Sequence, residues 1–215
     1  MLLKKVVMTV AMVMCFAVGA EAKLINTNDL AIAAGQTREC YIYLGNLTSD
    51  YVAFQIEVSL PKGLRLNAEN CLLTDRITDD DQALYVGEVG SNVFRLVSAS
   101  NTLTPLSRAD DVFVKLSLTA DETFQGGTVN LSNMFLVTSK SVKGNLIADS
   151  FKVDVVPYIK GDVNSSQSVE VTDLMLIVNY ILTPSGLYSS MMDVDGNGSV
   201  DVTDVMTVVN ILLGK

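Results

Sequence analysis

The sequence predicts a mainly β protein, in which a β-sandwich is followed by a small α-helical unit with two cation-binding loops. Two observations support this. From Ile25 to about Val156, apolar and polar residues alternate with a period of two, which is typical of half-buried strands. Residues 161–182 and 193–214 repeat one another, and in each repeat an acidic loop precedes an apolar stripe with helical spacing.

Composition sets the limits on size and partners. The chain has 215 residues, of which 49% are hydrophobic and 18% charged, so it can bury a real core. This length suits one medium domain and one smaller domain. The formal net charge of -9 argues against nucleic acid or an anionic membrane as a partner, and it fits a solvated surface or a cation site.

Residues 1–22 predict a cleaved export signal. Lys4 and Lys5 form a basic start, residues 6–18 are apolar, and Ala20 and Ala22 provide small residues at the spacing that a signal peptidase needs. The apolar run is too short for an ordinary membrane span, although an uncleaved membrane anchor is the alternative. We therefore expect a secreted, periplasmic or cell-surface protein.

Cleavage would remove Cys15 and leave Cys40 and Cys71. In an exported protein, these two cysteines could form one disulfide. They could equally remain two buried thiols, because sequence does not show whether two residues lie within bonding distance.

Five segments show the strand alternation most clearly. In the first, Cys40, Ile42 and Leu44 share one face, while Tyr41 and Tyr43 share the other. Turn signals rich in glycine, proline and asparagine separate the runs. Many short strands without an amphipathic helix favour a sandwich of two sheets. The five segments are 40–44, 54–60, 112–118, 129–137 and 151–156.

Nothing in this region predicts catalysis. The chain has no histidine, so the usual serine and cysteine triads are excluded. The acidic clusters 79–81 and 110–111 could in principle serve a glycosidase, but they lie in polar, loop-like stretches and are better interpreted as solvated surface. Tyr41 and Tyr43 could contact a ligand from their outer face, although exposed tyrosines are common on strands. We predict that the protein is not an enzyme.

Two stretches of the sandwich resemble a cohesin domain, namely AGQTRECYIYLGNLTSDYVAFQIEVSLPKGLRL (34–66) and VFRLVSASNTLTPLSRADDVFVKLSLTA (93–120). The resemblance lies in the order of strands and turns. It implies a jelly-roll-like sandwich over residues 23–156 that receives a dockerin-bearing protein. Carbohydrate-binding modules of the same fold are the alternative, and their partner would be a polysaccharide.

The C-terminal repeat contains two twelve-residue loops, 162–173 and 193–204, at an offset of 31 residues. Oxygen-bearing side chains stand at positions one, three, five, nine and twelve. This spacing surrounds a hard cation, with a backbone carbonyl at position seven, and Ca²⁺ takes six to eight such oxygens. We expect one calcium site in each loop. The predicted ligands are Asp162, Asn164, Ser166, the Ser168 carbonyl, Glu170 and Asp173 in the first, and Asp193, Asp195, Asn197, the Ser199 carbonyl, Asp201 and Asp204 in the second.

The first loop departs from the pattern. Ser166 replaces a carboxylate or amide, and Gln167 stands where Gly198 provides the sharp turn of the second loop. A glutamine in a left-handed turn costs about 1 kcal/mol. The first loop offers three carboxylates and the second four, so we predict tighter calcium binding at the second site. Val169 and Val200 could pair as a short strand contact between the loops.

A helix should follow each loop, with apolar stripes made by Leu174, Ile177, Val178 and Ile181 and by Val205, Val208, Val209 and Leu212. Residues 183–186 should end the first helix. No amphipathic helix precedes the first loop, so this is not a full EF-hand.

A loop and a helix, twice, with aspartate at position twelve, resembles a type I dockerin domain over 161–215, joined to the sandwich by a short linker at 157–160. The resemblance implies EF-hand-like calcium loops and a cohesin-type partner. It further implies that the residues before each final aspartate, Val171 with Thr172 and Val202 with Thr203, face that partner. The identity of the two pairs implies docking in two orientations related by a half-turn.

The sequence therefore predicts an exported, non-catalytic, calcium-dependent adaptor for protein–protein assembly. By resemblance it is associated with polysaccharide-degrading or cell-surface complexes. A carbohydrate-binding module anchored through a dockerin is the alternative. Self-association, head to tail, would follow if the two halves bind one another.

Overall fold

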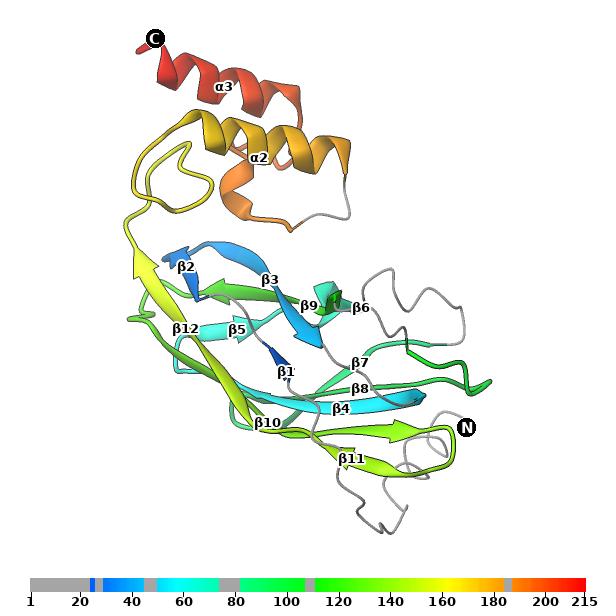
Figure 1. Ribbon diagram of the computed structural model, residues 1–215. Coiled ribbons are helices and arrows are strands. Elements are labelled where there is room, and N and C mark those ends of the chain that lie inside the picture. Colours follow the sequence, from blue (N-terminus) through cyan, green and yellow to red (C-terminus); the bar gives the residue numbers. More distant parts are fainter. Residues whose placement is uncertain (1–23, 26–28, 45–49, 74–81, 107–110, 184–186) are drawn as a thin grey trace.

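The computed structural model describes residues 24–25, 29–44, 50–73, 82–106, 111–183 and 187–215. It shows a two-sheet β-sandwich with two helices beyond one of its ends, which confirms the predicted fold class (Figure 1). The predicted export signal lies outside the described residues, as do the acidic cluster at 79–81, Asp110 and the turn at 184–186. In the described ranges, no helix is long and apolar enough to cross a membrane.

The smaller sheet has the strand order β1-β3-β9-β5, and β6 also pairs with β9. All its described pairs are antiparallel. A short 3-10 helix, η1 (Ala68–Asn70), lies between two of its strands along the chain. The strand bounds are β1 (Leu24–Ile25), β3 (Thr37–Leu44), β5 (Leu64–Leu66), β6 (Leu72–Leu73) and β9 (Asp111–Ala120).

The larger sheet has the order β2-β12-β10-β4-β8-β7, with β11 paired to β10. Its pairs are antiparallel except that β12 and β2 run parallel. The strand bounds are β2 (Leu30–Ala33), β4 (Tyr51–Ser59), β7 (Tyr85–Gly90), β8 (Val93–Ala99), β10 (Gly127–Thr138), β11 (Lys143–Asn145) and β12 (Asp149–Val156).

The core lies between the two sheets and is formed by the apolar faces that the alternation predicts. On β3, Cys40 and Ile42 are buried, whereas Tyr41 and Tyr43 are only half-buried. A fully buried aliphatic or phenyl side chain contributes about 1.5–3 kcal/mol relative to leaving it exposed. The buried faces of the next two predicted segments comprise Phe54, Ile56, Val58 and Leu60, and Val114, Leu116 and Leu118.

Strand β10 departs from simple alternation. Val129 and Leu131 are buried, but so are Met134 and Leu136, which have the opposite parity. A β-bulge explains this, because three steps along β10, from Ser132 to Phe135, oppose two steps along β4. The extra residue shifts the strand register by one, so the following side chains change faces.

Cys40 and Cys71 carry free thiols, and both are buried. The structure therefore has the two buried thiols rather than the disulfide that the sequence also allowed. The Cys71 Sγ lies 3.4 Å from the Asn67 carbonyl oxygen, to which it donates. Burial raises the pKa of Cys40 to about 12 because the thiolate would lose its hydration.

The C-terminal unit contains helices α2 (Val171–Leu182) and α3 (Val202–Leu212), with the 3-10 helix η3 (Ser190–Met192) between them along the chain. Its small core is the buried set Val163, Ile177, Met192, Val194 and Val208. Of the predicted stripe on α2, Ile177 lies in this core and Leu174 and Ile181 pack against it, whereas Val178 is half-buried outside this cluster. Val169 and Val200 also pack against it, but neither lies in a strand, so the predicted strand contact between the loops is wrong.

On α3, Val208 lies in the core and Val205 packs against it, but Val209 is half-buried outside this cluster and the end of the predicted stripe is wrong. Leu212 is exposed, and Ile211 packs against the core instead. Both positions follow Val208 by about one turn, so helical spacing alone does not separate them. Gly161 decides the choice, because a Cβ added there would lie only 3.1 Å from the Ile211 Cδ1. The missing side chain of Gly161 thus makes room for Ile211.

Candidate metal centre

The second loop gathers three carboxylates around one point. The ligand oxygens of Asp193, Asp195 and Asp204 all lie within 4.8 Å of one another. Among the residues that the structure describes, this is the one group of three or more acidic, histidine or cysteine side chains with such spacing. Asp204 is buried and Asp195 is exposed, so the group opens to solvent on one side. Convergent hard oxygens of this kind fit Ca²⁺.

Backbone amides hold the first aspartate of this loop. Asp193 accepts hydrogen bonds from the amides of Asn197 at 3.0 Å and Gly198 at 2.9 Å. The loop turns back on itself to make these bonds, and Gly198 adopts φ +88° at the turn. The left-handed conformation explains why the pattern places glycine at position six.

The last aspartate joins the loop to the helix. Asp204 Oδ1 accepts from the Val194 amide at 2.7 Å and the Asp195 amide at 3.1 Å. Its Oδ2 accepts from the amide of Asp201 at 2.9 Å, and Asp201 is the N-cap residue of α3. Asp201 and Asp204 thus form a capping box. The loop spacing predicted both as ligands but did not predict this second role, which an acidic pair three residues apart before an apolar run could have indicated.

The first loop has the same framework. Asp162 accepts from the amides of Ser166 at 2.9 Å and Gln167 at 2.8 Å. Asp173 accepts from the amides of Asn164 at 2.9 Å and Glu170 at 2.8 Å, and it forms the capping box of α2 with Glu170. Both aspartates are buried. The two loops therefore share one backbone arrangement.

The differences lie in side chains and glycine content. The second loop turns at Gly196 and Gly198, whereas the first has Ser165 at φ +62° and Gln167 at φ +71° in the same conformations. A left-handed non-glycine residue costs roughly 1–2 kcal/mol. The hydroxyl of Ser166 bonds the Ser168 carbonyl at 3.2 Å, so two of the predicted ligands of the first loop contact one another.

Hydrogen bonds hold the exposed carboxylate of Asp195 in the loop. The hydroxyl of Thr203 donates to Asp195 Oδ2 at 2.7 Å, and the amide of Asn197 donates to Asp195 Oδ1 at 3.0 Å. These bonds favour the charged form and lower the pKa of Asp195, the bond from Thr203 most strongly. The same bonds fix the position of the Asp195 carboxylate beside Asp193 and Asp204.

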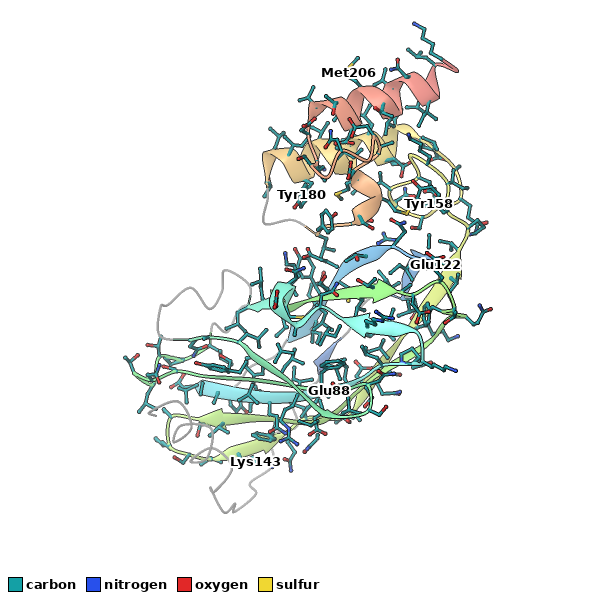
Figure 2. All side chains as sticks on the ribbon, turned by 180° about the vertical axis from the view of Figure 1, so that it is seen from behind. Glu88, Glu122, Lys143, Tyr158, Tyr180 and Met206 are labelled. Atoms are coloured by element: carbon teal, nitrogen blue, oxygen red, sulfur yellow. The ribbon has the colours of Figure 1, made fainter. Side chains whose placement is uncertain are left out.

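The four predicted partner-binding residues lie on the first turns of the two helices. Val171 is 63% exposed and Val202 is 64% exposed, and Thr172 and Thr203 are exposed beside them. One turn further along each helix lie Met175, 55% exposed, and Met206, 52% exposed. Figure 2 shows Met206 on the side of α3 that faces away from the sandwich. The two repeats thus present matching apolar surfaces.

The comparisons with known proteins fit this geometry. The family model of the dockerin type I domain matches residues 160–213. No curated protein sequence matches the chain. The structure is similar to the solution structure of CaCohA2 from Clostridium acetobutylicum, with 12% identity, a TM-score of 0.54, and coverage of 69% of this chain and 96% of that one. It is also similar to the Coh-OlpA-Doc918 complex, a type I cohesin–dockerin complex from Clostridium thermocellum, with 13% identity, a TM-score of 0.50, and coverage of 64% and 100%.

The molecule is thus a two-module protein that combines a cohesin-like sandwich with a pair of acidic loop–helix repeats. Its C-terminal unit is a type I dockerin, a family whose members bind calcium, and its sandwich has the cohesin fold.

Proposed function

We propose that this protein is an exported, non-catalytic assembly module whose dockerin binds a cohesin-type protein in the presence of calcium. The observation that supports this best is the pair of matching exposed surfaces on the first turns of α2 and α3, where each helix begins within the last positions of a carboxylate loop. A loop that calcium holds in place also fixes the start of the helix that follows. Calcium therefore orders the surface that meets the partner.

We assign four segments to the chain, namely the export signal 1–22, the sandwich 23–156, the linker 157–160 and the dockerin 161–215. The end of β12 at Val156 and the start of the first loop at Asp162 support these boundaries. Export places the protein outside the cytoplasm, as a secreted, periplasmic or cell-surface protein.

Both loops bind Ca²⁺ in this proposal, and the second binds more tightly. The donors are the twelve residues that the spacing predicts. The shared amide framework supports two sites, since it places the first and last aspartates of each loop in the same way. The four carboxylates and two glycines of the second loop support the order of affinity.

The partner contacts Val171 and Thr172 in one orientation of the dockerin, and Val202 and Thr203 in the other. Their nearly equal exposure supports this exchange, because a half-turn would place one pair where the other had been. Thr203 also links the surface to the calcium loop through its hydrogen bond to Asp195.

The sandwich in turn receives a dockerin-bearing protein, in a complex that degrades polysaccharides or assembles at a cell surface. Its cohesin fold supports a protein partner. A polysaccharide is the second candidate, which Tyr41 and Tyr43 favour, since their rings lie edge to face on β3 with centroids 6.0 Å apart. Retarded migration in a gel containing polysaccharide would support the second candidate.

The test uses the full chain and proteins captured from the secretome of the same organism, in calcium and in chelator. Calcium-dependent capture of a cohesin-bearing protein is expected. Replacing one pair, Val171 and Thr172 or Val202 and Thr203, with aspartates should leave capture intact, whereas replacing both pairs should abolish it. Val89→Asp, at an exposed valine of the sandwich, is the control. Capture that survives the double replacement would refute the proposed surface.

Sedimentation of the purified chain tests self-association separately. Oligomers that form with rising concentration in calcium, and not in chelator, would show that the dockerin of one copy binds the sandwich of another.

A further inference from the structure

One edge of the smaller sheet is shared between two distant segments of the chain. Among the residues that the structure describes, strand β1 pairs with β3 at Tyr43 and Leu44. On the same edge, the N-terminal half of β3 would leave backbone groups unpaired, and such edges tend to bind other strands. The segment between the two calcium loops lies against this half, between α2 and β3 (Figure 1).

The contact has the form of an added strand. The Glu39 amide donates to the Tyr188 carbonyl at 2.8 Å, and Arg38 forms an antiparallel bridge with Ser189. The Thr37 amide donates to the Ser190 hydroxyl at 2.9 Å, and that hydroxyl lies 2.7 Å from the Gln36 side-chain oxygen. The segment 188–190 therefore occupies the edge that β1 leaves open.

A buried charge lies at the centre of this contact. Glu39 is only 6% exposed, and its Oε2 accepts from the Tyr188 amide at 2.8 Å and from Lys115 Nζ at 2.9 Å. The ring of Tyr188 also packs against Tyr180 of α2, with centroids 5.8 Å apart. A buried carboxylate is tolerated where charged and polar donors satisfy it, and here one of those donors belongs to the dockerin.

Arg38 makes a second contact, on the other side of the strand from Glu39. Its Nη1 donates to the Ala31 carbonyl of β2 at 2.6 Å, so it joins the two sheets at the end of the sandwich. The same nitrogen lies 3.1 Å from the Ser165 hydroxyl and 3.3 Å from the Asn164 carbonyl, both in the first calcium loop. The guanidinium thus contacts the loop backbone directly.

We propose that residues 36–39, at the start of β3, are an intramolecular receptor for the segment 188–190 and the first calcium loop of the dockerin. The receptor fixes the dockerin in one orientation, with the exposed surfaces of α2 and α3 available for a separate partner. The chain then acts as a rigid adaptor rather than as two modules on a free linker. Arg38 contacts the backbone of the first loop, and calcium would hold that backbone in the conformation that Arg38 meets. Calcium in that loop and docking therefore favour one another, a point that rests on the proposed calcium binding.

Hydrogen exchange of the full calcium-loaded chain tests this. The amides of Thr37, Glu39 and Tyr188 are expected to exchange at least a hundredfold more slowly than in an unstructured peptide. Arg38→Ala with Ser190→Ala should speed their exchange at least tenfold while β9 and α2 keep their protection. The control is Arg65→Ala, which removes an exposed arginine of β5 in the same sheet. Adding a chelator should speed the exchange of the same three amides, while the amides of β9 stay protected.

Unprotected amides at Thr37, Glu39 and Tyr188 in the calcium-loaded wild type would overturn the receptor, as would undiminished protection in the double variant. Protection that persists in chelator would overturn the coupling to calcium. If α2 also loses protection in the double variant, Ser190→Ala alone takes its place. Faster exchange of the three amides in that variant supports the receptor, and unchanged exchange overturns it.

Small-angle scattering adds a second measure, because undocking should increase the longest dimension of the chain. No partner protein is involved, so a failure here is separate from a failure of cohesin binding.

Discussion

Gln167 and Gly198 occupy the same position in the two acidic loops and adopt the same left-handed backbone, with φ of +71° and +88°. The amide of each donates to Oδ2 of the first aspartate of its loop, at 2.8 Å for Gln167 and 2.9 Å for Gly198. The amide framework therefore imposes the conformation, whichever residue stands there.

Gln167→Gly should relieve this strain and stabilise the folded first loop by about 1 kcal/mol. Calcium affinity at the first site should rise about fivefold, which corresponds to the same free energy. Calorimetric titration measures it. Gly198→Gln should weaken the second site by a similar factor, since a Cβ at Gly198 meets no atom within 4 Å and only the backbone is strained.

Ser141→Gly is the matched control. Ser141 also has a left-handed backbone, with φ +62°, but it lies in the sandwich. Its replacement should stabilise the protein without changing calcium affinity. Equal calcium affinities for Gln167→Gly and the wild type would contradict the strain argument.

The relative calcium affinities of the two sites can be measured with one conservative change in each loop. Asp162→Asn weakens the first site and leaves the second intact, and Asp193→Asn does the reverse. The intact second site of Asp162→Asn should bind calcium on the order of tenfold more tightly than the intact first site of Asp193→Asn, because the second loop has one more carboxylate. A tighter remaining site in Asp193→Asn would show that charge count does not decide the order.

Lys115→Met should lower the free energy of unfolding of the sandwich by about 3 kcal/mol, since it leaves Glu39 as a buried unpaired charge. The Lys115 side chain is 13% exposed and that of Glu39 is 7% exposed. Arg95→Met is the comparison, because Arg95 pairs with Glu57 across strands while 41% exposed. Its loss should cost less than about 1 kcal/mol. Urea denaturation followed by circular dichroism measures both, and equal costs would refute the distinction.

The raised pKa of Cys40, about 12, predicts an unreactive thiol. At pH 8 the thiolate is a minute fraction, so iodoacetamide should not modify Cys40 in the folded protein. In urea without reductant, both Cys40 and Cys71 should be modified, whereas a disulfide would protect them.

The same shift makes stability depend on pH. The unfolded thiol, with a pKa near 9.0, ionises first as pH rises. The free energy of unfolding should therefore fall between about pH 9 and pH 12, and Cys40→Ala should flatten that slope.

Local spacing in the sequence was sufficient for the strands β3, β4, β9, β10 and β12, for the two helices and for the loop in which Asp193, Asp195 and Asp204 come together. Alternation and the twelve-residue loop are periodic or fixed patterns that neighbouring residues carry. Where two residues satisfied one pattern equally, as Ile211 and Leu212 did, packing against Gly161 chose between them. The bulge in β10 could likewise not be predicted from the sequence, because it depends on the pairing with β4.

Only the tertiary structure decided what Arg38 and Glu39 do. In the sequence they are two charged residues at the start of a strand. In the fold, Glu39 meets Tyr188, which is 149 residues away, and Arg38 meets Ser165, which is 127 residues away. Contacts between such distant segments leave no spacing in the sequence, since they arise from the position where the dockerin meets the open edge of the sheet.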